Sequence, residues 1–280
     1  MTAKKLSDRF AALEAEGRRA LICYITAGHP DAHTTVSVMR GLERAGVDVI
    51  ELGIPFSDPL ADGPVIQASS QLALEGGMRY DRALELIAEA KLGIPVIIFS
   101  YLNPLLAAGP TALERAANAG ASGVLVTDLP VGADEPREQW LASSPLAFVR
   151  LVAPTTPDDR MAEIARHGSG FVYLISRLGV TGARSDLPPE LPSTVARLRQ
   201  ATKLPIAVGF GISRPEHARE VGRIADGVVV GSAMVSAIGE SESRAFELAR
   251  ALRAGLDEAT VAPAAQGARD RAAGRPELGA

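Results

Sequence analysis

Eight apolar segments recur along the chain, and charged stretches with helical spacing separate them. Within each segment the apolar residues do not alternate with polar ones, which is typical of strands buried on both faces of a parallel sheet. Strands that alternate with helices predict βα units, and eight such units close most simply as a (β/α)8 TIM barrel. The predicted strands are residues 20–25, 47–52, 94–99, 123–127, 146–152, 170–175, 204–208 and 224–230.

A doubly wound open sheet is the alternative arrangement of the same elements. Its usual GxGxxG motif is missing after the first predicted strand, so the barrel is favoured. Before that strand, Leu6, Phe10 and Leu13 have the spacing of a short amphipathic helix, which adds an N-terminal helix to the barrel. We expect one catalytic barrel domain over residues 1–258. A disordered tail is expected over residues 259–280, where small, polar and helix-breaking residues follow no period.

Composition excludes several classes of protein. The net charge is −4 and the 29 basic residues are scattered, so no nucleic-acid footprint is visible. No apolar segment reaches membrane-spanning length, and the N-terminus lacks the apolar core of a signal peptide. Cys23 is the only cysteine, which rules out an intrachain disulfide and fits a reducing cytoplasm. No metal site is expected, because metal-ligand spacing is absent among His29, His33, His167 and His217.

Residues 49–63 carry two acids in different settings. Glu51 lies near the end of an apolar segment and is expected to point into the barrel mouth, where desolvation raises the pKa of its carboxyl group towards neutrality. Asp62 lies in the following loop and is expected to stay ionised and to accept a hydrogen bond from a substrate N–H. Two structural alternatives stay open. For Glu51, the alternative is a buried acid that pairs with a structural arginine. For Asp62, the alternative is the N-cap of a helix that has Pro64 at its first position.

Glycine-rich turns follow the last two predicted strands. Gly209 and Gly211 follow one strand, and Gly231 and Ser232 lead from the next directly into the last helix. Backbone N–H groups at such turns bind phosphate, and the loops after strands seven and eight are the usual phosphate site of TIM barrels. The alternative is that the glycines merely end the strands. No Lys or Arg lies inside these turns, so phosphate recognition is expected to rest mostly on backbone amides.

A further connection, residues 176–192, is longer than a barrel needs and follows a strand. It therefore belongs to the end of the barrel where active sites are built. Its Gly, Thr and Ser content predicts a lid, and Gly182 is placed to close over the phosphate. Tyr24 and Tyr173, on the first and sixth predicted strands, are either core aromatics or flank a flat apolar substrate at the barrel mouth.

Residues 50–63 resemble, throughout their length, the signature of the tryptophan synthase alpha subunit family. The resemblance extends over most of residues 5–256. It includes residues 20–30, 99–104, 127–131, 173–182, 209–213 and 231–233. The resemblance implies a TIM barrel that cleaves indole-3-glycerol phosphate to indole and D-glyceraldehyde 3-phosphate in a retro-aldol reaction.

By similarity to this family, Glu51 is the general acid and base, which protonates indole C3 and helps to remove a hydroxyl proton of the glycerol chain. Asp62 holds the indole N–H, and Thr181 bonds Asp62 when the lid closes. Tyr173 lies beside the substrate, and Tyr24 stands near the indole pocket where the family more often has phenylalanine. The residues that hold the phosphate are Gly182, Gly211, Gly231 and Ser232.

The resemblance also implies a partner, the pyridoxal-phosphate beta subunit, in an αββα heterotetramer where indole passes to the beta subunit for L-tryptophan synthesis. The alpha subunit itself is expected to need no cofactor. Leu178 and residues 183–189 are less typical of the family's lid. A stand-alone lyase and an inactive activating subunit are the rival readings of the same chain. Residues that match partner-facing positions are Pro55, Asp58, Asn103, Asp128 and Pro130.

Overall fold

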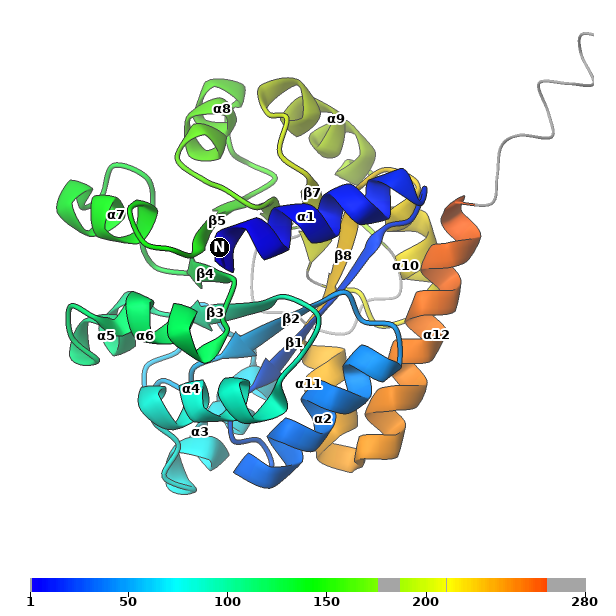
Figure 1. Ribbon diagram of the computed structural model, residues 1–280. Coiled ribbons are helices and arrows are strands. Elements are labelled where there is room, and N and C mark those ends of the chain that lie inside the picture. Colours follow the sequence, from blue (N-terminus) through cyan, green and yellow to red (C-terminus); the bar gives the residue numbers. More distant parts are fainter. Residues whose placement is uncertain (1, 176–186, 210, 261–280) are drawn as a thin grey trace, which may run out of the picture.

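The computed structural model of the protein describes residues 2–175, 187–209 and 211–260 (Figure 1). Within these residues eight parallel strands form a closed barrel, in which each strand pairs with its neighbours in sequence and the first pairs with the last. Every predicted apolar segment overlaps one strand, so the predicted TIM barrel is confirmed. The strands are β1 Ala20–Thr26, β2 Val49–Gly53, β3 Val96–Ser100, β4 Gly123–Val126, β5 Ala147–Val152, β6 Val172–Ile175, β7 Ile206–Gly209 and β8 Gly227–Val230.

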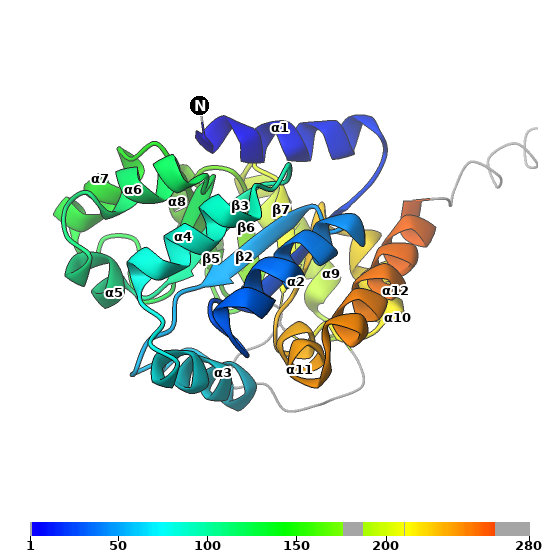
Figure 2. The same ribbon diagram turned by 60° about the horizontal axis from the view of Figure 1, so that its bottom comes forward.

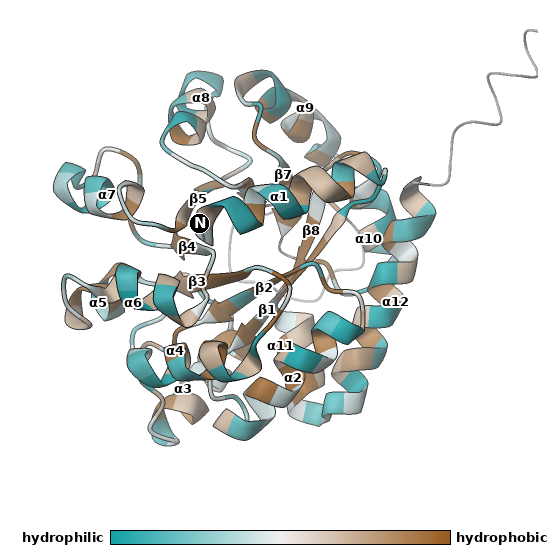
Figure 3. Ribbon diagram, viewed as in Figure 1, coloured by the Kyte–Doolittle hydropathy of each residue, from teal (hydrophilic) through white to brown (hydrophobic). Residues whose placement is uncertain are grey.

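Helices surround the barrel, and hydropathy explains their placement (Figure 3). The strands are largely apolar, whereas the helices carry many polar residues on the outside of the molecule. None of the helices in the described part of the chain is long and apolar enough to cross a membrane. They are α1 Thr2–Ala15, α2 Ala32–Arg44, α3 Pro64–Glu75, α4 Tyr80–Ala90, α5 Leu102–Ala107, α6 Ala112–Ala119, α7 Glu135–Ala142, α8 Asp158–Arg166, α9 Leu191–Ala201, α10 Pro215–Gly222, α11 Ser232–Glu240 and α12 Glu242–Thr260.

The N-terminal helix α1 covers one end of the barrel, whereas α3 lies at the opposite end (Figure 2). Leu6, Phe10 and Leu13 of α1 are buried and belong to the same apolar cluster as the side chains of the barrel interior. The ring of Phe10 lies 5.3 Å from the ring of Phe171, measured between centroids. The predicted extra helix is thus confirmed, and it fills the end of the barrel at which the strands begin.

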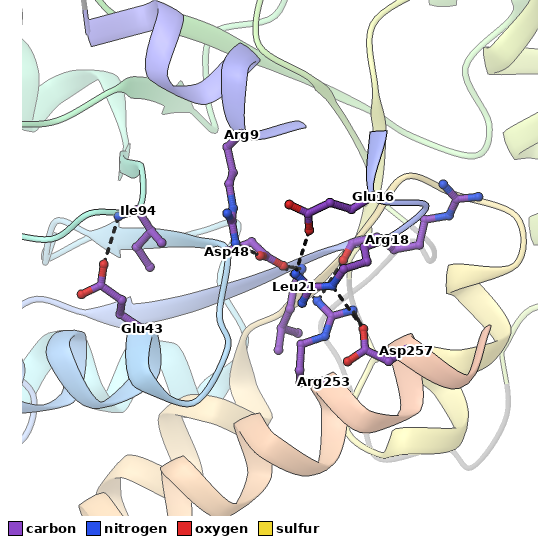
Figure 4. Close-up of polar contacts among 10 residues, drawn as sticks. Arg9, Glu16, Arg18, Leu21, Glu43, Asp48, Ile94, Arg253 and Asp257 are labelled. Atoms are coloured by element: carbon purple, nitrogen blue, oxygen red, sulfur yellow. Dashed lines mark hydrogen bonds and ion pairs between the residues drawn. The ribbon is translucent and has the colours of Figure 1, made fainter. Parts of the chain in front are cut away.

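Asp48 joins several elements at this same end (Figure 4). It directly precedes β2 and is fully buried. Its carboxylate accepts hydrogen bonds from the backbone N–H of Leu21 at 2.8 Å and from Nη1 of Arg253 at 2.9 Å, and it also pairs with Arg9. Two arginines and one backbone N–H thus satisfy the buried carboxylate and tie α1, α12 and β1 to the start of β2.

Part of the predicted organisation lies outside the described residues. Residues 261–280, which make up most of the predicted tail, are among them, and α12 continues to Thr260. Residues 176–186 of the predicted lid are also outside. The last two residues of that predicted connection, Leu191 and Pro192, begin α9.

Candidate active site

A cavity of about 520 Å³ opens at the end of the barrel where the strands finish. This volume falls within the range of about 300–1,000 Å³ that is usual for small-molecule sites. The cavity is lined from β1, β2, β3 and β6 and from the segments that follow β2, β7 and β8. All the predicted catalytic and substrate-binding residues within the described part of the chain line this cavity: Glu51, Asp62, Tyr24, Tyr173, Gly211, Gly231 and Ser232. Thr181 and Gly182 lie outside the described residues.

Glu51 reaches the cavity because of its place in β2. Val49, two residues earlier, packs in the barrel interior, and side chains two apart on a strand point to the same face. In register, Glu51 lies between Tyr24 of β1 and Ile97 of β3. Its side chain is therefore directed inward, as predicted.

The carboxyl group of Glu51 is fully buried, and neither of its oxygens has a hydrogen-bond partner among the residues that the structure describes. Burial raises the pKa of Glu51 to about 8, because the ionised form loses its hydration. Within the described residues, the alternative of a pair with a structural arginine is therefore wrong. A carboxyl group in this state can both donate and accept a proton near neutral pH.

Asp62 occupies a different environment at the rim of the cavity. Burial raises the pKa of Asp62 to about 6, and a hydrogen bond from the hydroxyl of Tyr101 opposes that rise. The same hydroxyl accepts the backbone N–H of Ala61 at 2.9 Å, which fixes Tyr101 against the loop. Asp62 therefore ionises at a lower pH than Glu51, so the two acids of the cavity are in different states over a range around neutrality.

The helix-cap interpretation of Asp62 is wrong. The N-cap of α3 is Gly63, in an extended conformation, and no side chain caps this helix. Pro64 does occupy the first helical turn, as the sequence suggests. The helix begins at Pro64 as that interpretation requires, but Gly63 and not Asp62 is the residue directly before it, so the carboxylate of Asp62 is left to face the cavity and Tyr101.

Tyr24 and Tyr173 form aromatic walls of the cavity, and both are buried. Burial raises the pKa of both phenols, so they stay protonated at neutral pH. Each hydroxyl lies over a glycine at the end of the neighbouring strand: a Cβ at Gly53 would overlap the Tyr24 hydroxyl, and one at Gly209 would overlap that of Tyr173. Gly209 therefore makes room for an aromatic side chain, a role that its position in a predicted phosphate turn does not reveal.

The glycine turns after β7 and β8 converge on the same cavity. Gly211 has a φ of +85°, which favours glycine, and open space surrounds the position of a Cβ. Ser232 begins α11 directly after Gly231, and the first turn of α11 contains no acidic residue. Backbone N–H groups at a helix N-terminus attract anions, so this side of the cavity suits a phosphate.

The family is decided by comparison with known proteins. A model of the family "Tryptophan synthase alpha chain" matches residues 10–262. The chain belongs to this family. It is 44% identical over 268 residues to the tryptophan synthase alpha chain of Caulobacter vibrioides, covering 90% of this chain and 98% of that one. It is 47% identical over 259 residues to that of Laribacter hongkongensis, covering 91% and 98%.

Solved structures of tryptophan synthases have the same fold. A tryptophan synthase structure from Mycobacterium tuberculosis superposes with a TM-score of 0.83 at 36% identity, over 90% of this chain and 97% of that one. The tryptophan synthase subunit alpha of Legionella pneumophila also superposes with a TM-score of 0.83, at 34% identity, over 91% and 98%. The family resemblance of the sequence is therefore confirmed.

The residues that the sequence predicts to face a partner differ in exposure. Asp58, Asn103, Asp128 and Pro130 are exposed, whereas Pro55 is buried in this chain. The carboxylate of Asp128 accepts the backbone N–H of Leu102 at 2.7 Å, which links the loop after β4 to the start of α5, beside Asn103. Two of the loops expected to face a partner are thus joined to each other.

Three residues that sequence reasoning leaves aside also matter here. Tyr101 contacts Asp62, and Arg214 and His217 line the cavity. Tyr101 directly follows β3 and Arg214 comes directly after the 209–213 turn, so position at a strand exit is the signal that could have found them. No group of His, Cys, Asp and Glu among the described residues is arranged to hold a metal ion.

Proposed function

We propose that this chain is the alpha subunit of a tryptophan synthase and that its cavity cleaves indole-3-glycerol phosphate to indole and D-glyceraldehyde 3-phosphate. The observation that carries this proposal is Glu51, a buried carboxyl group with a pKa of about 8 that lines the cavity and has no partner among the described residues. Burying an acid in this way costs stability, and a reaction that needs a proton donor and acceptor at neutral pH accounts for it.

The reaction breaks the bond between indole C3 and the first carbon of the glycerol chain. Protonated Glu51 delivers its proton to C3, which leaves a positive charge on the ring nitrogen of the indole. The hydroxyl on the first carbon of the glycerol chain, the carbon bonded to C3, then loses its proton to the Glu51 carboxylate, and a C=O bond forms at that carbon. The electron pair of the breaking carbon–carbon bond returns to the ring, which gives neutral indole and an aldehyde. Glu51 ends protonated, as it began.

Asp62 supports this reaction by accepting the indole N–H. With a pKa of about 6 it is ionised at neutral pH, and its negative charge stabilises the positive charge that develops on the ring. Tyr101 holds the carboxylate, and Tyr24 and Tyr173 flank the flat indole ring. Thr181 is proposed to bond Asp62 during turnover.

The phosphate of the substrate is proposed to lie at the glycine turns. Gly211, Gly231 and Ser232 line the same cavity that holds the two acids, and their backbone N–H groups are proposed to bind the phosphate together with Gly182. This places the glycerol chain between the phosphate and Glu51, with the indole ring between the tyrosines. The cavity volume is sufficient for a ligand of that size.

The beta subunit is the proposed partner, in an αββα heterotetramer that works in the cytoplasm. Pyridoxal phosphate is expected on the beta subunit only, and we propose that this chain needs no cofactor. The exposed residues Asp58, Asn103, Asp128 and Pro130, together with Pro55, are proposed to face the partner. Leu60, in the same loop as Asp58, is 90% exposed and is therefore accessible to a partner that covers this loop.

The direct test is indole formation from indole-3-glycerol phosphate by the purified chain, with and without the beta subunit. We expect weak activity alone and a large increase with beta, together with co-elution of the two chains. Full activity alone without co-elution would favour a stand-alone lyase. No indole release in either condition, with co-elution retained, would favour an inactive activating subunit.

A further inference from the structure

Arg214 is the only Lys or Arg among the described residues that line the cavity. It directly follows the glycine turn at residues 209–213, on the same side as Gly211, and it precedes α10 as the N-cap residue. Its side chain is exposed, which places it at the mouth of the cavity. The cavity otherwise contains two acids, Glu51 and Asp62.

This charge distribution bears on how a phosphate ester enters. A phosphate monoester carries close to two negative charges at neutral pH, and an ionised Asp62 in the same cavity repels them. Backbone N–H groups and a helix N-terminus offset this repulsion only through partial charges. A guanidinium supplies a full positive charge and a planar pair of donors that matches two phosphate oxygens.

His217 positions the guanidinium. The Nη2 atom of Arg214 lies 3.0 Å from Nε2 of His217, which is buried on the first turn of α10 and lines the cavity itself. Because an arginine can only donate, His217 accepts this hydrogen bond at Nε2. Ile212, also buried, anchors the intervening turn. Arg214 is thus directed by a buried neighbour, although its own side chain is exposed.

We propose that Arg214, held by His217, binds the phosphate of the substrate and selects phosphorylated over unphosphorylated ligands. This inference rests on the proposed function, because it takes the anion to be the phosphate of indole-3-glycerol phosphate. It changes the expectation that phosphate recognition is left to backbone amides. Since the contact forms at a solvent-exposed mouth, its effect is moderate, about a tenfold change in affinity.

The experiment compares Arg214→Gln, Arg214→Lys and a control, Arg219→Gln. Arg219 lies on α10, the helix that Arg214 precedes, but it pairs with Glu258 of α12 and does not line the cavity. For each variant, kcat and KM for indole-3-glycerol phosphate are measured, and so are the Kd values of glycerol 3-phosphate and of indole by calorimetry.

We expect Arg214→Gln to raise KM and the Kd of glycerol 3-phosphate by about tenfold. The Kd of indole, which has no phosphate, and kcat should stay within twofold. Arg214→Lys should recover part of the loss, and Arg219→Gln should behave as the unmodified chain. The rise in KM and the rise in the Kd of glycerol 3-phosphate caused by Arg214→Gln should both become smaller at high salt, because the contact between Arg214 and the phosphate is exposed to solvent.

Unchanged KM and unchanged glycerol 3-phosphate binding in Arg214→Gln would overturn the inference. So would equal weakening of indole and glycerol 3-phosphate, since that pattern indicates a general disturbance of the cavity. If the unmodified chain released no indole, the proposed function would fail, and the glycerol 3-phosphate titration would still decide the role of Arg214.

Discussion

Asp48 and Glu51 are buried acidic residues three positions apart, the first directly before β2 and the second in the middle of it. Asp48 accepts hydrogen bonds from a backbone N–H and from two arginines, whereas Glu51 has no partner among the described residues. Burial is the same, so solvent exposure alone does not separate a structural acid from a reactive one. The number of donors that face each carboxylate does.

The difference follows the two ends of the barrel. At the end covered by α1, Asp48 holds separate elements together, and charges there are neutralised. Towards the open end, Glu51 keeps its proton because no cation in the described part of the chain offsets its burial. This division agrees with the general behaviour of TIM barrels, in which stability is built at one end and catalysis at the other.

The largest effect is expected from Glu51→Gln on catalysis. The amide cannot transfer the proton, so indole release should fall by a factor of about 10² to 10⁴ while the fold is kept. The matched substitution Asp48→Asn changes the same chemical group three residues away, and it should retain the rate to within a few-fold wherever the protein is folded. Turnover of Glu51→Gln near the normal rate would remove Glu51 from the mechanism.

Glu51→Gln should also stabilise the protein against unfolding at alkaline pH. Burial raises the pKa of Glu51 from 4.5 to about 8, so the folded state holds a proton that the unfolded state releases between these values, and stability falls as pH rises through that window. At about 1.4 kcal/mol for each pKa unit, the gain of Glu51→Gln above pH 8 has an upper limit of about 5 kcal/mol. Below pH 4.5 both chains are neutral at this position, and the difference should vanish.

Urea unfolding at pH 5 and pH 9 measures this change. A Glu51→Gln chain whose stability relative to the unmodified protein is the same at both pH values would show that the carboxyl group ionises normally.

Asp48→Asn should destabilise the protein, whereas Glu51→Gln is expected to stabilise it at alkaline pH. It leaves the buried guanidinium of Arg253 with less compensation, and loss of one member of a buried pair typically costs about 3 kcal/mol or more. Arg253 also pairs with Asp257, which keeps the expected loss near the lower end of that range. Urea unfolding at pH 7 is the measurement, and an unchanged midpoint would contradict the role given to Asp48.

A smaller effect is expected from Tyr101→Phe. Loss of the hydroxyl removes the hydrogen bond that lowers the pKa of Asp62, so that pKa should rise further above 6. The acid limb of the kcat/KM profile should move to higher pH, with a several-fold loss at pH 6 and little change at pH 8. Tyr80→Phe is the control, because the Tyr80 hydroxyl bonds the carbonyl of Ala112 on the outer helices. An identical profile for both variants would argue against a contact between Tyr101 and Asp62.

The sequence predicts the barrel well because a strand that is buried on both faces is visible in the sequence as an unbroken apolar segment. Glu51 stands out for the same reason, since an acid inside such a segment is costly. The position of Asp62 relative to α3 is harder to predict, because the turn at residues 59–62, closed by the bond from the Asp62 N–H to the carbonyl of Pro59, shifts the cap to Gly63.

Tyr101, Arg214 and His217 are beyond sequence patterns for another reason. Tyr101 and Arg214 reach the cavity from segments that follow strands, and His217 reaches it from the first turn of α10, so each depends on how a side chain is directed by neighbouring strands and helices. Gly209 illustrates the same limit: its spacing indicates an anion-binding turn, yet the space above it is taken by the Tyr173 hydroxyl from the adjacent strand.

The helix α1 restricts the route by which small molecules enter and leave the cavity. Because its apolar side chains fill the barrel at the start of the strands, a molecule formed beside Glu51 does not leave through that end of the barrel. Entry and exit therefore both take place at the end of the barrel where the strands finish. A protein seated over that end is placed to affect both the arrival of the precursor and the escape of the product to bulk water.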